Sequence, residues 1–521
     1  MQPSPPDKYQ HKYLIAAAVT MAAVLELIDT SIVNVAIPHM MGNLGATLDE
    51  ISWVSVGYII ANVIVIPMSA WLSAYFGRRR YLTFSILLFV AASFFCGAAT
   101  SLWGLVFWRV VQGIGGGALL STAQSTLWEA FPPHEVGIGQ AIFGIGIMVG
   151  PTLGPTLGGF IVDNWNWPWI FYINLPLGLF AAALVWTYVT DSEHQERAEK
   201  VDWLGIGLLT VAIGSLQWML ERGERYDWFD SGFVTTLAVV SAGSFIWLVW
   251  HELRTDEPVI NFHLLTNRQL ATGVLMGAVL GFALFGSVFV LPIFLQSLHG
   301  LTANQTGLVI LPGAIASAVT MAVMGRRLRM LPDGRPIILV GGSLFGVCMY
   351  QLAFLSFDSG AHDLFWPLIL RGVAMGMMFI PLNSIALAEL APRDMANGTG
   401  LFNLTRQLGG SIGIAVMATL LSHITKAKKA LLADHLVATA PDVQARMEAM
   451  THALTAKGAS LSVAHQQALA IMDRTVGVQA SVLAFSRIYW ISGFVLMASL
   501  PLMLFWHNGR PRGLVIRDGG H

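Results

Sequence analysis

Residues 138–161 read IGQAIFGIGIMVGPTLGPTLGGFI, 24 positions without a charged side chain. A helix needs roughly 20 apolar residues to cross the hydrocarbon core of a bilayer, which is about 30 Å thick. This stretch is therefore predicted to be a transmembrane helix. Its glycines at four-residue spacing would lie on one face, where a neighbouring helix can approach to backbone contact. They are Gly146, Gly150, Gly154 and Gly158.

Similar apolar runs continue on both sides of this helix, separated by polar or turn-forming breaks. They predict an all-α polytopic membrane protein with 14 transmembrane helices. The predicted spans are 13–37, 52–73, 81–99, 102–125, 138–161, 169–190, 203–221, 231–252, 270–298, 306–325, 337–357, 364–390, 398–424 and 484–506.

Composition agrees with a lipid environment. Charged residues make up 11% of the 521 positions and hydrophobic residues 55%, whereas about 25% of a soluble globular protein is charged. An ordinary soluble enzyme is thereby excluded. The net charge of −1 offers no basic surface for nucleic acid, which is not expected as a partner. Cys96 and Cys348 lie inside apolar runs, so neither a disulfide framework nor a metal cluster is expected.

The distribution of basic residues predicts the orientation in the membrane. An even number of spans puts both termini on one side, and short cytoplasmic loops carry an excess of Lys and Arg. Seventeen basic residues fall in the loops on the side of the termini, against Arg222 and Arg225 in the opposite short loops. We therefore expect a multi-pass membrane protein with both termini in the cytoplasm.

An internal repeat divides the chain. Gly77-Arg78-Arg79 after the second span is echoed by Gly334-Arg335 after the tenth, and Arg109 in the fourth span by Arg371 in the twelfth. The echoes predict two six-helix bundles in the same orientation with an inserted two-helix hairpin between them. This layout is typical of carriers that alternate access to a central site. The expected parts are an N-terminal bundle (1–190), a linker with the hairpin (191–253), and a C-terminal bundle (254–521) with a long extracytoplasmic loop at about 425–483.

Glu26 and Asp29 lie near the middle of the first span, three residues apart and on roughly one helix face. A charged group at the bilayer centre costs about 2.5–3.5 kcal/mol, so the pair should face a cavity rather than lipid. Desolvation and mutual repulsion there favour the protonated form, as a proton-coupling site requires. Asp29 is the expected coupling residue and Glu26 an accessory one. The alternative is that both are bonded permanently to neighbouring polar groups or to Arg109.

Arg109 lies within the fourth span and needs a partner, either backbone carbonyls or a carboxylate of the first span. A role in proton relay and a purely structural role both fit. Arg371 and Arg406 pose the same problem in the second half, where we favour a structural role.

Three further sets of residues are candidates for function. Amides at membrane depth would line a substrate cavity or bond helices together: Asn34, Gln112, Gln124, Asn383, Asn403 and Gln407. The glycine helix would serve as a pivot or seal bent by prolines, or as a passive helix crossing: Gly146, Gly150, Pro151, Gly154, Pro155, Gly158 and Gly159. The loop with Gly77, Arg78 and Arg79 would anchor the topology or act as a gating latch.

The sequence contains no nucleotide-binding loop of the form G-x-x-x-x-G-K-[ST], no catalytic constellation and no His/Cys cluster. ATP is therefore not expected as the direct energy source, and we predict no catalytic residue, metal or cofactor. The proton-motive force is the expected driving force.

Several motifs resemble those of one family, over nearly the whole chain. They are Ile28 to Pro38 (IDTSIVNVAIP), Arg109 to Gly113 (RVVQG), Gly150 to Gly159 (GPTLGPTLGG), Trp169 to Pro176 (WIFYINLP), Leu295-Gln296, Leu311 to Gly313 (LPG) and Arg406 to Ser411 (RQLGGS). The chain thus resembles the fourteen-span drug:proton antiporters of the major facilitator superfamily, the EmrB and QacA type. In that family, the loop after the second span carries an acidic residue where this chain has Ala74, so the charge-based switch of the family is in doubt here.

The resemblance implies proton-coupled export of lipophilic, aromatic or cationic compounds by alternating access. It also implies an open choice between action alone and action with a periplasmic adaptor and an outer-membrane channel. A helix near 460–472 could dock on such a partner or lie on the carrier as a lid. A lipid or glycolipid transporter on the same scaffold is one alternative, and a non-transporting membrane sensor or enzyme is another.

Overall fold

The computed structural model describes residues 9–506 except 133–134, 193–199, 331–332, 358 and 438. Five of the seventeen basic residues that predict the orientation lie outside the described residues; they are Lys8, Arg197, Arg510, Arg512 and Arg517. The described chain is built of helices, which confirms the all-α class.

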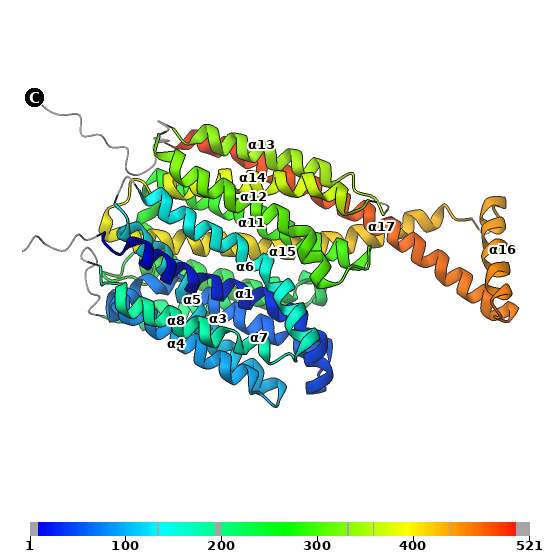
Figure 1. Ribbon diagram of the computed structural model, residues 1–521, viewed down its shortest axis with the longest axis horizontal. Coiled ribbons are helices and arrows are strands. Elements are labelled where there is room, and N and C mark those ends of the chain that lie inside the picture. Colours follow the sequence, from blue (N-terminus) through cyan, green and yellow to red (C-terminus); the bar gives the residue numbers. More distant parts are fainter. Residues whose placement is uncertain are drawn as a thin grey trace, which may run out of the picture.

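The first half of the chain forms one bundle, drawn in blue to cyan in Figure 1. Its helices are α1 (Lys12–Leu44), α2 (Leu48–Ile51), α3 (Trp53–Phe76), α4 (Arg78–Gly97), α5 (Leu102–Ala130), α6 (Val136–Asn164), α7 (Trp169–Tyr172) and α8 (Asn174–Tyr188). The inserted hairpin consists of α9 (Trp203–Arg222) and α10 (Gly232–Glu252), joined through η1 (Glu224–Tyr226) and η2 (Trp228–Asp230).

The second half forms the other bundle, drawn in green to red. It contains η3 (Phe262–Thr266), α11 (Arg268–Ser297), α12 (Ala303–Arg327), η4 (Leu328–Met330), α13 (Arg335–Leu352), α14 (Ala361–Ala386), η5 (Pro392–Asp394), α15 (Met395–Asp434), α16 (Pro441–Ala456), α17 (Leu461–Ser499) and η6 (Leu500–Phe505).

The two bundles repeat the same helix pairings. In the first, α1 packs on α6, α3 on α5, and α4 on both α5 and α8; in the second, α11 packs on α15, α12 on α14, and α13 on both α14 and α17. The contacts between bundles are also paired, with α6 against α12 and α3 against α15. The internal repeat predicted from a few arginines and glycines is therefore also present in how the helices pack.

By length and composition, twelve helices of the described residues could cross a membrane, and counting the bent α6 gives thirteen. The remaining predicted span, 102–125, coincides with α5, which has 29 residues but is not among these helices. Glycines, glutamines and Arg109 lower the apolar content of α5. The count of fourteen thus stays a prediction.

The segment 425–483 is largely helical rather than an open loop. α15 continues to Asp434, α16 follows, and α17 begins at Leu461. We call the end of α15, α16 and the start of α17 the arm, which projects from one end of the bundles in Figure 1, opposite the start of α1 and the end of α17. Lys429 Nζ donates to Asp473 Oδ2 over 2.9 Å and joins the two long helices within the arm.

Candidate functional site

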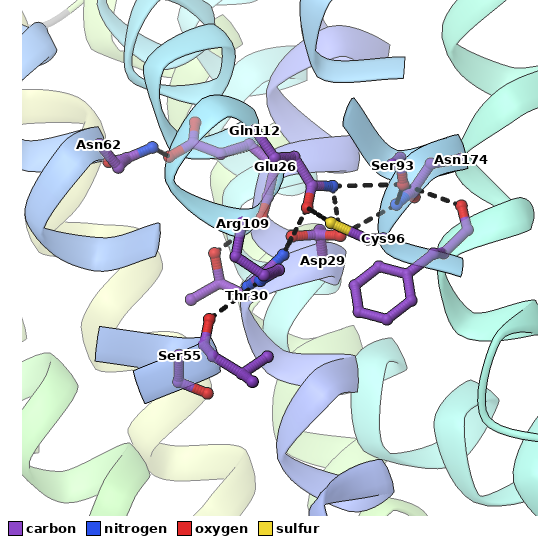
Figure 2. A network of polar contacts seen from close by, with 12 residues as sticks. Glu26, Asp29, Thr30, Ser55, Asn62, Ser93, Cys96, Arg109, Gln112 and Asn174 are labelled. Atoms are coloured by element: carbon purple, nitrogen blue, oxygen red, sulfur yellow. Dashed lines mark hydrogen bonds and ion pairs between the residues drawn. The ribbon is translucent and has the colours of Figure 1, made fainter. Parts of the chain in front are cut away.

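Asp29 and Arg109 form the centre of a buried polar network in the first bundle (Figure 2). Arg109 Nη1 donates to Asp29 Oδ2 over 2.5 Å, while Gln112 Nε2 and Asn174 Nδ2 donate to Asp29 Oδ1 over 2.9 and 3.0 Å. The side chain of Asp29 is 0% exposed and that of Arg109 1%. Breaking such a pair leaves an uncompensated buried charge, so the two groups hold α1 and α5 together.

The guanidinium of Arg109 has partners on every side. Its Nε donates to the backbone carbonyl of Val54 over 3.1 Å, Nη1 also reaches Gln112 Oε1 at 2.7 Å, and the group lies 4.2 Å from the centre of the Tyr58 ring. The cation–π contact adds to the hydrogen bonds because the guanidinium is buried. Both kinds of partner left open by the sequence are observed: a carboxylate of α1, from Asp29, and a backbone carbonyl, from Val54.

Ser93 and Asn174 complete the network and were not singled out from the sequence. Ser93 Oγ accepts from Gln112 Nε2 and Asn174 Nδ2 over 3.2 and 3.0 Å and donates to the carbonyl of Phe171 over 2.9 Å. Asn174 lies in the motif quoted above from Trp169 to Pro176, which is the one signal that could have identified it. The network therefore draws on α1, α3, α4, α5, α7 and α8.

Glu26 occupies a different environment, one turn before Asp29. Asn62 Nδ2 donates to Glu26 Oε1 over 2.9 Å, and the side chain is buried with 6% exposure. Oε2 has no hydrogen-bond partner among the described residues. Two carboxylates that look alike in the sequence thus differ: Asp29 has full hydrogen bonding and Glu26 has only part of it.

A second polar cluster joins the two bundles. Gln124 Nε2 on α5 donates to Asn383 Oδ1 on α14 over 2.7 Å, and Asn403 Nδ2 on α15 donates to Gln124 Oε1 over 2.5 Å. Gln140 Oε1 on α6 lies 3.4 Å from the same Gln124 nitrogen. All four side chains are buried. We call this cluster the amide bridge.

Of the six amides predicted to line a cavity, four are in these two networks. Asn34 is exposed and accepts only a 3.5 Å hydrogen bond from Ser55 Oγ, and Gln407 is partly exposed. The structure does not bring these two into either network.

The glycine stripe of α6 packs directly against α1. A Cβ at Gly146 would lie 2.7 Å from Thr20, at Gly150 2.8 Å from Leu27, at Gly154 1.8 Å from Ser31 and at Gly158 2.8 Å from Ile32. Gly159 points elsewhere, with 3.7 Å to Asn304 of α12. α6 also bends by 42° between its parts Val136–Pro151 and Leu153–Asn164, next to Pro151, one of the two prolines that were expected to bend it.

The loop with Gly77 contacts a carboxylate from far along the chain. Gly77 has φ +85°. The backbone N–H of Arg79 donates to Asp191 Oδ1, 112 positions further along the chain, over 2.9 Å. Arg78 Nη2 donates to Glu129 Oε1 over 2.6 Å. These hydrogen bonds join the start of α4 to the chain after α8 and to the end of α5. Ala74 takes part in neither of them.

The family profile of the Major Facilitator Superfamily matches residues 19–414. The multidrug export protein EmrB of Escherichia coli (strain K12) is 32% identical over 508 residues, 97% of each chain. The fatty acid resistance protein FarB of Neisseria gonorrhoeae is 29% identical over 522 residues, 99% of each chain. The solved structure of the proton:xylose symporter XylE has a TM-score of 0.60 at 13% identity, covering 97% of this chain and 98% of that one, and so shares the fold. With paired six-helix bundles, buried charges at membrane depth and these relatives, the chain belongs to the major facilitator superfamily of membrane transporters.

Proposed function

We propose that the protein is a proton-coupled multidrug exporter of lipophilic, aromatic or cationic compounds that works by alternating access. The observation that carries this proposal is the buried Asp29–Arg109 pair. Protonation of Asp29 would remove its charge and weaken its bond to Arg109, which holds α1 against α5. Proton uptake and a change in helix packing would therefore be linked, as antiport requires.

The remaining candidates take roles consistent with their places in the structure. Glu26, with its partly satisfied carboxylate, serves as an accessory proton site or a site for a substrate cation. The glycine stripe allows α1 and α6 to stay in contact while they move, and the bend of α6 marks where the helix yields.

Vesicles that contain the purified protein test the coupling. With wild type, an imposed pH gradient should drive uptake of a lipophilic cation, and addition of that cation should release protons. Asp29→Asn should abolish both, because the residue can no longer titrate, while Asp163→Asn at the exposed end of α6 should change neither. Unchanged pH-driven transport in Asp29→Asn would contradict the proposal.

We further propose the inner membrane as the location, with both termini in the cytoplasm and the arm on the opposite side. A periplasmic adaptor with an outer-membrane channel is the proposed partner of the arm. Asp473→Cys in the arm should react with a membrane-impermeant thiol reagent added to intact spheroplasts, because Asp473 is exposed. Labelling only after lysis would contradict this orientation.

Export of amphiphilic lipids is the second candidate function. It is favoured by the likeness to FarB, whose name assigns it resistance to fatty acids. Competition between a fatty acid and a lipophilic cation for transport in the same vesicles would distinguish a shared site from a lipid-specific one.

A further inference from the structure

Arg406 is a buried arginine whose hydrogen bonding is incomplete. It lies on α15 with 1% exposure, and its Nη2 donates to Asn403 Oδ1 over 3.2 Å. Its Nε and Nη1 have no hydrogen-bond partner in the part of the chain that the structure describes. Leaving donors of a charged group buried and unpaired costs more than the bond itself would contribute. Such a residue needs a reason to be retained.

The surroundings of Arg406 belong to both bundles. α15 packs on α3 and α5 of the first bundle, and a Cβ at Gly400 would lie 3.9 Å from the carbonyls of Ile66 and Pro67. The neighbouring Asn403 belongs to the amide bridge. Arg406 is therefore placed at the boundary that separates when a carrier of this fold changes its access.

Glu26 carries the matching charge on the other side of the boundary. It is close enough to Arg406 for the two charges to act on each other, but no hydrogen bond joins them, and Glu26 Oε2 is also unpaired. A permanent structural ion pair would use these free atoms on each other. Arg406 instead keeps free donors on one bundle and Glu26 a free acceptor on the other, so each charged group can bind a third group.

We propose that Arg406 binds the carboxylate of acidic amphiphilic substrates, so that the substrate site has an anion-binding pole at Arg406 beside the carboxylate of Glu26. A carboxylate supplies the acceptors that Nε and Nη1 lack, in the charge-assisted bonds that guanidinium groups form most strongly. The ring of Phe379, 6.0 Å from the guanidinium, offers an apolar surface to the body of the same molecule. The inference rests on the proposed export function and assigns a residue to the acidic group of its substrates, which the fatty acids of the second candidate function also carry.

Binding without a proton gradient tests the inference separately from coupling. The purified protein in nanodiscs is titrated with naphthoate, an aromatic carboxylate, and with tetraphenylphosphonium, an aromatic cation. Arg406→Gln should weaken naphthoate binding about tenfold or more, because a charge-assisted bond is lost, and should leave the cation affinity unchanged or higher. Arg406→Lys should retain part of the naphthoate affinity, since it keeps the charge.

Arg371→Gln is the matched control. Arg371 is likewise buried with an unpaired Nη1, but the groups that act on it, Cys348 and Tyr489, belong to its own bundle. This variant should change neither affinity. Equal naphthoate binding in wild type and Arg406→Gln overturns the inference, as does an equal loss of both ligands in both Arg406 variants. If naphthoate binding depends on Arg406 but a pH gradient drives no transport in vesicles, the proposed coupling fails and the anion site stands.

Discussion

Asp29 and Arg109 are 80 positions apart in the sequence, yet Arg109 Nη1 and Asp29 Oδ2 lie 2.5 Å apart in the interior of the first bundle. Neither side chain has appreciable contact with solvent. The pair therefore contributes to packing as well as to any proton chemistry, and mutations can separate the two roles.

Arg109→Met should destabilise the protein by about 3–5 kcal/mol, because it leaves the charge of Asp29 buried without its partner. The double variant Asp29→Asn with Arg109→Met removes both charges and should recover much of that loss. Thermal unfolding in detergent of the wild type, both single variants and the double variant measures the coupling. Additive losses in the double variant would show that the two side chains do not depend on each other.

Gly154→Ala should disrupt the contact of α6 with α1, since its Cβ would lie 1.8 Å from Ser31 Oγ and 2.7 Å from Ser31 Cβ. We expect a loss of at least about 1–3 kcal/mol, the usual cost of overpacking, and loss of transport. Gly159→Ala on the same helix is the control, because its Cβ would be 3.7 Å from the nearest atom. Thermal stability and vesicle transport measure both variants, and equal effects would show that the stripe has no special role.

Gln124→Leu should loosen the two bundles from each other, because it removes the hydrogen bonds that Gln124 makes with Asn383 Oδ1 and Asn403 Nδ2. Each of the two lost bonds contributes about 1 kcal/mol, so the equilibrium between closed and open arrangements should shift about thirtyfold. Hydrogen–deuterium exchange of α5 and α15 should become faster. Gln407→Leu on α15, outside the amide bridge, should leave this exchange unchanged.

The loop of the inserted hairpin connects both bundles near the arm. Arg222 donates to Asp49 of α2, and Trp228 Nε1 donates to Thr419 Oγ1 on α15 over 2.9 Å. Asp227 and Trp228 have φ of 52° and 50°, a conformation that costs a non-glycine residue about 1–3 kcal/mol. The loop therefore has an unfavourable backbone conformation at the residue, Trp228, that bonds to α15.

Trp228→Phe should release the loop from α15, because the ring loses its hydrogen-bond donor. Spin-label distances between α2 and the end of α15 near the arm should then broaden. Thr419→Val removes the acceptor and should have the same effect, and the double variant should add nothing further. Additive broadening would mean that the two residues act separately.

Asp191→Ala should destabilise the start of α4, because the carboxylate accepts from the N–H of Arg79 in the first turn. The expected cost is about 0.5–2 kcal/mol, as for the loss of a helix N-cap. Gly77→Ala should cost at least as much, since φ +85° is unfavourable for alanine and its Cβ would lie 3.1 Å from Asp191. Chemical unfolding measures both, and stability equal to wild type in Asp191→Ala would contradict the capping role.

The class of fold and the charged residues buried inside it can be predicted from the sequence alone. A helix in lipid must satisfy its own backbone groups and present apolar side chains, so long uncharged runs and the few charges inside them can be read directly from the chain. Glu26, Asp29 and Arg109 were identifiable for this reason. The four-residue spacing of the α6 glycines likewise predicted a close helix contact, because helix geometry places them on one face.

The partner of each polar group depends on the tertiary structure and cannot be predicted from the sequence. The hydrogen bonds of Asp29 come from Arg109, Gln112 and Asn174, on helices 80 to 145 positions away, and no local pattern encodes such contacts. The tertiary structure also gives Asp29 and Glu26 different environments, although both residues lie on α1. The physical reason is that hydrogen bonds act over about 3 Å, so their partners depend on how helices pack and not on their order in the chain.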